Sequence, residues 1–110
     1  MFAFLKKCLP QALESVSTSE LEGLLRGKKV ILLDVRTPQE YSSGHIKRAR
    51  NVPLGEVASY QGPKDEKIYV ICQSGMRSKR ATKILTKMGY EAVNVRGGMA
   101  AYRGKKVGGR

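Results

Sequence analysis

Tryptophan is absent from this chain of 110 residues, cysteine occurs twice and histidine once. Two cysteines, Cys8 and Cys72, cannot build a disulfide framework, so a reducing compartment such as the cytoplasm is the expected location. The sequence has no C-x-x-C or other metal-ligand spacing, and we predict no metal site. No apolar run approaches the roughly 18 residues that a membrane helix needs, so we predict no membrane span.

Acidic residues are nearly missing from the last third of the chain. Residues 77–110 hold ten Lys or Arg against Glu91 alone, and they carry most of the net charge of +12. Such a field concentrates anionic ligands and steers acidic partners, and it attracts nucleic acid without specificity. Because no aromatic interleaving or nucleic-acid motif accompanies the charge, we predict no specific nucleic-acid partner. The plain alternative is a solvated basic face without any partner.

The length suits one domain with a single core, and we expect a monomer. We place this domain at residues 14–103, between an N-terminal arm at 1–13 and a flexible basic tail at 104–110. The apolar start of the arm is too short for a signal-peptide core. We interpret it as loosely ordered or as a small amphipathic contact, and Cys8 within it as an incidental thiol.

Apolar runs rich in β-branched residues alternate with helical patterns along the chain. This alternation is typical of an α/β domain built on a mostly parallel sheet. Strands are predicted at residues 30–33, 49–52, 68–71 and 92–95. Helices are predicted to start at two capping boxes, Ser17 to Glu20 and Thr37 to Glu40, and a brief helical turn is expected at 55–59. After residue 78, an apolar stripe at helical spacing predicts an amphipathic helix with a basic outer face, formed by Lys79, Arg80, Lys83 and Lys87.

The stretch with the most chemical information is Cys72-Gln73-Ser74-Gly75-Met76-Arg77-Ser78. It leaves a buried strand and opens a helix, where unpaired N–H groups and the helix dipole favour a thiolate. Such surroundings lower a cysteine pKa from about 8.5 to roughly 3.5–7.5. Ser74 and Gly75 keep the loop small enough for its amides to curl around an anion. Arg77 either donates to the same centre or braces the loop from outside, and Ser78 is expected to cap the helix. The alternative is a cysteine that is merely a small buried hydrophobe.

Three ordered motifs extend this interpretation to most of the chain. The first reads Leu33-Asp34-Val35-Arg36-Thr37-Pro38-Gln39-Glu40-Tyr41, then Gly44-His45-Ile46 and Asn51-Val52-Pro53-Leu54; the second is the cysteine loop; the third is Arg96-Gly97-Gly98-Met99. Together they resemble the single-domain rhodaneses, a family of sulfurtransferase modules, over about residues 16–102. The resemblance implies a single rhodanese-like domain with five mostly parallel strands and helices on both faces, the extra short strand lying at residues 15–17.

The resemblance also implies a mechanism for Cys72. In the family, the loop cysteine takes the outer sulfur of a donor such as thiosulfate or a persulfide and holds it as a persulfide. It then passes this sulfur to a thiophilic acceptor such as cyanide or a protein thiol, and the basic field of this chain suits an acidic protein as a partner. Two half-reactions of this kind predict ping-pong kinetics. Residues 73–78 form the substrate-binding cup through their backbone N–H groups, and neither a metal nor an organic cofactor is implied.

Two other functions are weighed against sulfur transfer. Related dual-specificity phosphatases and arsenate reductases close a C-x5-R loop around a tetrahedral oxyanion, whereas Cys72 to Arg77 reads C-x4-R. The shorter loop suits one sulfur atom better than a phosphate, so phosphatase or arsenate chemistry is disfavoured. A rhodanese-like docking or sulfur-carrier module with little small-molecule turnover is the alternative from another class.

Five residues outside the loop need separate interpretation. Asp34 and Arg36 support the site, either as an ion pair at its mouth or with Arg36 attracting the donor. His45 is expected to make a structural hydrogen bond in its Gly-His-Ile turn rather than to act as a base. Glu40 stands where two-domain thiosulfate sulfurtransferases often carry an arginine that binds the donor, which weakens the case for thiosulfate. Tyr102, where many relatives have tryptophan, is interpreted as a packing residue.

Overall fold

The structure, a computed structural model, describes residues 13–27 and 29–109, so the predictions for Cys8 and the start of the arm lie outside the described residues. Along the chain the elements are β1 (Ser15–Val16), α2 (Thr18–Gly27), β2 (Ile31–Asp34), α3 (Pro38–Ser43), β3 (Arg50–Asn51), η1 (Leu54–Ser59), β4 (Ile68–Ile71), α4 (Met76–Lys87), β5 (Ala92–Val95) and α5 (Gly98–Ala101). Within the described ranges, no helix has the length and apolar character needed to cross a membrane.

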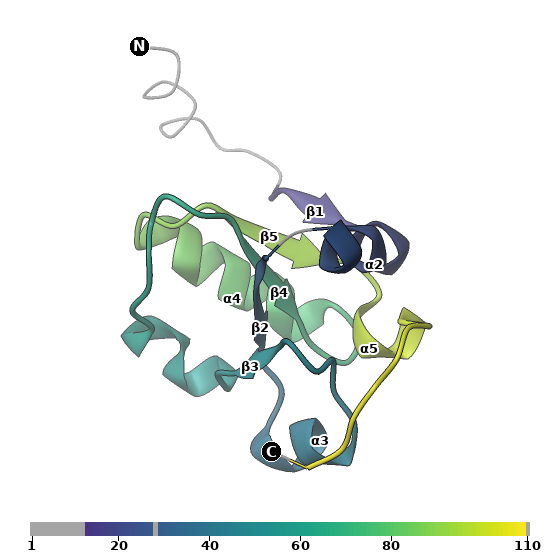
Figure 1. Cartoon of the computed structure of the whole chain (residues 1–110). Helices are drawn as coiled ribbons and strands as arrows, with labels where there is room; N and C mark the ends of the chain where they lie inside the picture. Colours follow the sequence, from purple (N-terminus) through teal and green to yellow (C-terminus); the bar gives the residue numbers. More distant parts are fainter. Residues whose placement is uncertain (1–12, 28, 110) are drawn as a thin grey trace.

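The five strands form one sheet in the order β1-β5-β4-β2-β3, and every neighbouring pair is parallel (Figure 1). The predicted α/β fold with a five-stranded parallel sheet is therefore confirmed. The central strand β4 is buried over its whole length between β2 and β5. Because parallel strands end at the same edge, the pairing of Asp34 with Ile71 brings the end of β2 beside the start of the cysteine loop.

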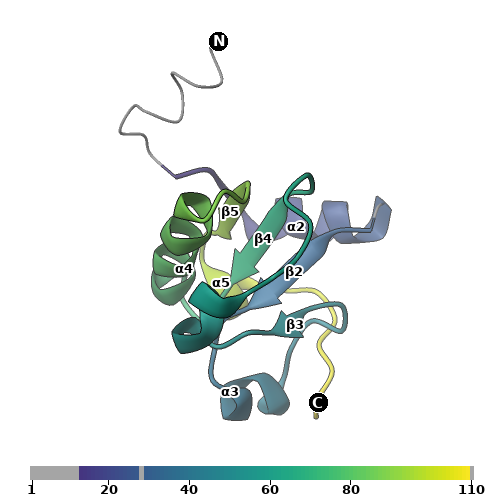
Figure 2. The same cartoon turned by 90° about the vertical axis from the view of Figure 1, so that its left-hand side faces the viewer.

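Helices cover both faces of the sheet, as predicted (Figures 1 and 2). On one face, side chains of α4 and η1 pack against the strands, and Leu33, Val70 and Leu85 belong to the same buried cluster. On the other face, α2 and α5 cover the side chains that point the opposite way, among them Tyr69 and Val93. Successive strand residues point to opposite faces. This alternation places the residue after β4, Cys72, on the α4 face.

Two predicted capping boxes are present and fix the starts of α2 and α3. At α3, the Glu40 amide donates to Thr37 Oγ1 over 3.2 Å, and the Glu40 carboxylate accepts from the Thr37 amide over 2.9 Å. Ser17 and Glu20 exchange the same two bonds ahead of α2. Figures 1 and 2 both place α3 beyond the carboxyl ends of β2 and β3. The cap therefore holds Glu40 on the side of the sheet where the cysteine loop lies.

The structure differs from the predicted frayed tail at residues 104–109. Val107 and His45 exchange two backbone hydrogen bonds of 2.8 Å, and the Gly109 amide donates to the Ser42 carbonyl over 2.8 Å. In Figure 1 this yellow segment runs back along the turn that follows α3. The Lys, Gly and Arg residues of the tail did not predict this backbone pairing. An isolated bridge between two residues needs no periodic pattern of apolar side chains.

Candidate active site

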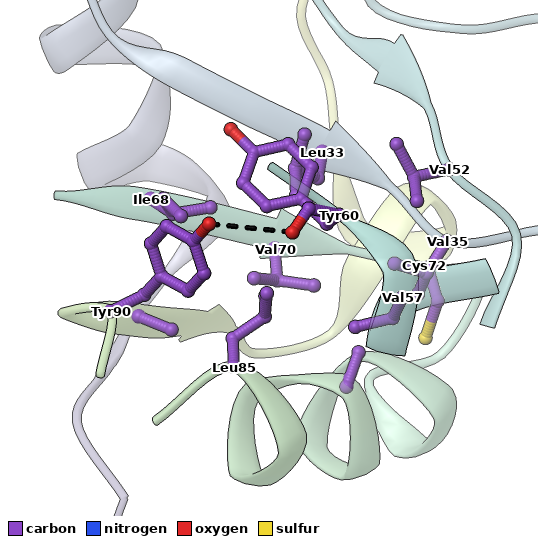
Figure 3. Packing of buried hydrophobic residues seen from close by; sticks show 12 residues of the cluster. Leu33, Val35, Val52, Val57, Tyr60, Ile68, Val70, Cys72, Leu85 and Tyr90 are labelled. Atoms are coloured by element: carbon purple, nitrogen blue, oxygen red, sulfur yellow. Dashed lines mark hydrogen bonds between the residues drawn. The ribbon is translucent and has the colours of Figure 1, made fainter. Parts of the chain in front are cut away.

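Cys72 lies at the carboxyl edge of the sheet, directly after β4. Its side chain is buried at one end of the apolar cluster between the sheet and α4, near Val35 and Val57 (Figure 3). In open parallel sheets, ligands bind at this edge, where loops rather than strands surround them. The thiol therefore has apolar walls on its inner side and the predicted loop on its outer side.

Three hydrogen bonds surround the sulfur atom of Cys72. The amides of Gly75 and Ser78 donate to it over 3.1 and 3.3 Å, and the thiol itself donates to Ser78 Oγ over 3.3 Å. Helix α4 begins at Met76 with Gly75 as its N-cap, and no side chain of the described residues caps it. The first-turn amides have no helical partners, so they are free to serve the sulfur. Gly75 has a φ of 103°, a conformation that only glycine adopts readily.

Burial and these hydrogen bonds act in opposite directions on the pKa of Cys72. Burial is the largest single influence and raises the pKa of Cys72, because a charged sulfur loses its water. Hydrogen bonds from the Ser78 side chain and from the amides of Ser78, Gly75 and Ser74 act the other way and together outweigh burial. The net effect lowers the pKa of Cys72 below its usual value. A shift in this direction makes the nucleophilic thiolate more accessible.

Ser78 does not cap α4, and that prediction was wrong. The helix starts two residues earlier, so the Ser78 side chain points inward instead of back over the first turn. It is fully buried, and its hydroxyl donates to Asn94 Oδ1 on β5 over 2.6 Å. Ser78 instead connects the sulfur to the sheet.

Arg77 braces the loop from outside. Both terminal nitrogens of its guanidinium donate to the Glu40 carboxylate, over 2.6 and 2.8 Å. These bonds to Arg77 are the main reason that the pKa of Glu40 falls from 4.5 to about 2, against the opposing effect of burial. A two-point arginine–carboxylate pair fixes orientation as well as charge. It connects the start of α4 to the start of α3, and the positive charge of the guanidinium is balanced by the carboxylate.

Asp34 and Arg36 form a buried ion pair below the loop. Arg36 donates to both carboxylate oxygens of Asp34, and its side chain is 4% exposed against 0% for Asp34. The same guanidinium also donates to the Gly44 carbonyl over 2.8 Å and to Gln73 Oε1 over 3.4 Å. With all these donors engaged, Arg36 connects β2, the turn after α3 and the loop.

Helix α5 supports the loop from the other side. The amides of Met99 and Ala100 donate to the carbonyls of Cys72 and Gln73 over 2.8 and 2.9 Å. This approach requires Gly98, whose φ is 57°, because a Cβ there would overlap the Cys72 carbonyl and lie 2.7 Å from the Gln73 carbonyl oxygen. The loop carbonyls are therefore held outward, which turns the loop amides toward the sulfur.

The remaining predicted residues divide between the rim and the scaffold. Gln73 and Ser74 are exposed at the rim, and Met76 is the one large hydrophobic side chain that stands exposed among the described residues, at 76%. His45 belongs to the turn after α3. Its Nδ1 is 2.7 Å from the Tyr41 carbonyl oxygen and its ring stacks on Tyr41 at 3.6 Å, which agrees with the structural interpretation.

Two contributors to the site were not predicted. Asn94 lies within an apolar strand, where the period-two alternation of Val93 and Val95 signalled that residue 94 faces α4. Gly98 was noted only as part of a motif, without a physical role. No group of three or more metal-binding side chains occurs in the described ranges.

The fold and site are those of a parallel α/β domain with a buried, hydrogen-bonded cysteine at the carboxyl edge of its sheet. The chain belongs to the rhodanese-like domain family, whose model matches residues 17–105. It is 37% identical to the thiosulfate sulfurtransferase PspE of Escherichia coli over 81 residues, which are 70% of this chain and 78% of PspE. It is 40% identical to YqhL of Bacillus subtilis over 81 residues, 71% of this chain but 64% of YqhL. A crystal structure of a rhodanese-like domain protein from Staphylococcus aureus matches with a TM-score of 0.78 at 36% identity, covering 83% of this chain and 92% of that one.

Proposed function

We propose that this protein is a sulfurtransferase that carries a sulfane sulfur on Cys72. The observation that supports this most is the buried Cys72 sulfur, which receives amide donors from Gly75 and Ser78. A relative named thiosulfate sulfurtransferase and the family match support the same reaction class. Residues 73–78 are the proposed substrate cup. Asp34 and Arg36 are proposed to support it from below as an ion pair.

The proposed reaction has two balanced half-reactions. In the first, the Cys72 thiolate attacks the outer sulfur of thiosulfate, the sulfur–sulfur bond of the donor breaks, and sulfite leaves with the bonding electron pair. In the second, cyanide or a thiolate attacks the outer sulfur of the Cys72 persulfide, and Cys72 leaves again as a thiolate. The acceptor reacts with the persulfide, which exists only after sulfite has left. Ping-pong kinetics are therefore expected. The loop amides stabilise the negative charge at both stages.

The ion pair between Arg77 and Glu40 bears on the identity of the donor. Arg77 is the cation nearest to the cup along the chain, and its charge is already matched by a carboxylate at 2.6 Å. A dianion such as thiosulfate therefore meets less positive charge than the net +12 suggests. This favours a donor with less charge, such as a persulfide. The residue type at Glu40 already weakened the case for thiosulfate, and the ion pair weakens it further. The same pairing disfavours phosphatase or arsenate chemistry, in which an arginine has to face the oxyanion.

Mass spectrometry of the intact protein tests the proposal. After treatment with thiosulfate, and separately with glutathione persulfide, the mass should rise by one sulfur atom, and peptide mapping should place it on Cys72. The variant Cys72→Ser should gain nothing, and it leaves Cys8 as a built-in control for non-specific sulfur uptake. If neither donor loads Cys72, the sulfurtransferase proposal fails.

A sulfur-carrier module is the second candidate, and the surface beside the loop favours it. Met76 is exposed at the start of α4, and the basic side chains that follow, Lys79 and Arg80, are exposed as well. An apolar side chain with two cations one helical turn further along suits an acidic protein that delivers or accepts sulfur in a reducing compartment. Loading without turnover separates the two candidates: a carrier takes up one sulfur on Cys72 but releases little thiocyanate when cyanide is the acceptor.

A further inference from the structure

Three buried side chains form a hydrogen-bonded chain beneath the loop. The thiol of Cys72 donates to Ser78 Oγ over 3.3 Å, and the Ser78 hydroxyl donates to Asn94 Oδ1 over 2.6 Å. Cys72 follows β4, Ser78 belongs to α4 and Asn94 to β5, so the chain links the helix to two strands. All three residues are 7% exposed or less. Inside such a site, each donor needs a fixed acceptor, because water does not replace a lost partner at low cost.

With its proton on Asn94, the Ser78 hydroxyl can accept from a thiol but cannot donate to a thiolate, so the bond from Ser78 that lowers the Cys72 pKa requires this proton to turn. A serine hydroxyl has one proton, and Ser78 directs it to Asn94. Once Cys72 has lost its proton, the sulfur can only accept a hydrogen bond, and the Ser78 oxygen would face it with lone pairs. The thiolate is stabilised only if the hydroxyl proton turns toward the sulfur. That turn, however, leaves Asn94 Oδ1 facing the lone pairs of Ser78.

An asparagine can remove this conflict because its amide has an acceptor at one end and two donors at the other. Half a rotation about the last side-chain bond puts Nδ2 in the place of Oδ1. Nδ2 then donates to Ser78 Oγ, and Ser78 donates to the Cys72 sulfur. For residues 13–27 and 29–109, the bond from Ser78 is the only hydrogen bond found for the Asn94 side chain. No other partner among these residues opposes the rotation.

We propose that Asn94 is a positioning residue for the nucleophile: the orientation of its amide decides which way the Ser78 hydroxyl points, and so whether the sulfur is held as thiol or thiolate. The inference rests on the proposed function in taking Cys72 as the nucleophile. One proton leaves Cys72 for solvent during the change, and all other protons stay on their own groups.

The two arginines next to the loop, Arg77 and Arg36, are already paired, and the nearby cations Lys79 and Arg80 are exposed to solvent on α4. Arg77 on α4 is bound to Glu40 on α3 over 2.6 Å. Arg36, after β2, is bound to Asp34 over 2.8 Å. The hydroxyl of Ser78 and the loop amides are thus the groups that respond directly when the sulfur changes its charge.

Nuclear magnetic resonance of the unaltered protein is the first test. The chain has two asparagines, and the second one, Asn51, is a matched control. Asn51 Nδ2 is held by the carbonyls of Asp34 and Arg36 at 2.9 Å each, so its amide has no reason to turn. As pH rises, the side-chain nitrogen resonance of Asn94 should move with the same midpoint as the thiolate absorbance of Cys72. The corresponding resonance of Asn51 should move much less. An Asn94 resonance that stays constant while Cys72 ionises overturns the proposal.

A double-mutant cycle on the pKa of Cys72 is the second test. In Asn94→Asp, an ionised carboxylate can only accept, so it holds the Ser78 hydroxyl away from the sulfur. Losing a hydrogen bond to a charged group should raise the Cys72 pKa by about one to two units. The new negative charge raises the pKa as well. In the Ser78→Ala background the charge remains but the hydroxyl is gone, so the same substitution should shift the pKa by about one unit less.

Equal shifts in the two backgrounds would show that Asn94 acts by charge or packing alone, and the proposal would be wrong. If Asn94→Asp does not fold, Asn94→Leu is a second variant that carries no charge. Its effect on the Cys72 pKa should also depend on the presence of Ser78. Thermal unfolding identifies any variant that fails to fold. Since thiol titration needs no sulfur donor, a protein that never loads sulfur would refute the proposed function and still report on Asn94.

Discussion

At the scale of single residues, the two carboxylates near the loop play different roles. Asp34 is fully buried and is matched by the buried Arg36, so that pair belongs to the scaffold. Glu40 is about one-third exposed, like Arg77, and it serves twice: it closes the capping box of α3 and holds the arginine of the loop. A pair at this exposure is weakened by water and salt, so its contribution to stability is small, and orientation of the loop is its main effect.

The ion pair between Glu40 and Arg77 predicts a specific dependence of stability on pH. Bonds from Arg77 lower the pKa of Glu40 from 4.5 to about 2 in the folded chain. The unfolded chain therefore binds more protons between these values, so folding stability falls as pH falls through this window. Above pH 4.5 the contribution is complete, and for a pair about one-third exposed we expect about 0.5–1 kcal/mol.

Urea unfolding of the natural protein and of Glu40→Gln between neutral pH and pH 3 measures this effect. The natural protein should be the more stable of the two at neutral pH, and the difference should shrink once the pH falls below 4.5. Glu66→Gln, at an exposed carboxylate in the turn before β4, is the control and should show no such trend. A difference that is the same at every pH would mean that the variant acts through the α3 cap and not through charge.

At the scale of elements, the close contact of α5 with the loop predicts the effect of a single methyl group. In Gly98→Ala, the new Cβ would overlap the carbonyls of Cys72 and Gln73, and the backbone would keep a φ of 57°. A left-handed conformation costs about 1–2 kcal/mol for alanine, and overpacking typically costs about 1–3 kcal/mol more. We expect a loss of stability of about 3 kcal/mol and a marked loss of sulfur loading, because the loop has to move.

Gly23→Ala is the matched control for this variant. Gly23 lies inside α2, and an added Cβ there meets nothing within 4 Å. Alanine in a helix interior is about 0.5–1 kcal/mol more favourable than glycine, so this variant should be slightly more stable and should load sulfur normally. Thermal unfolding and intact-mass measurement compare the two directly. Normal loading by Gly98→Ala would contradict the role given to α5.

Local sequence patterns predicted the helices and strands, but they did not predict several contacts of the site. Capping boxes at Ser17 and Thr37 and the β-branched runs located helices and strands, because both signals lie within a few neighbouring residues. The bond between Arg77 and Glu40 joins positions 37 apart, and that between Ser78 and Asn94 joins positions 16 apart. Such contacts depend on how strands are ordered in the sheet, which no local pattern specifies. The sequence motif therefore located the cysteine, and only the fold gave its partners.

At the scale of the whole molecule, the excess positive charge poses a question that kinetics can answer. A diffuse field would attract an anionic donor regardless of where each cation lies, whereas a local field acts only from cations close to the cup. Lys79 and Lys87 are both exposed on α4, in its first and last turns. With a rise of 1.5 Å per residue they lie about 12 Å apart along the helix. Screening at physiological ionic strength acts over about 8 Å, so these two positions should differ in effect.

We therefore predict that Lys79→Glu lowers kcat/KM for thiosulfate several-fold at low salt, and that Lys87→Glu lowers it much less. The two variants change the net charge equally, so a diffuse field would affect both alike. Added salt should reduce the loss in Lys79→Glu, because it screens the exposed charge that causes it. Steady-state rates with thiosulfate and cyanide at several salt concentrations provide the comparison. Equal losses in both variants would assign the attraction to the overall charge of the protein and leave α4 without a special part in capturing the donor.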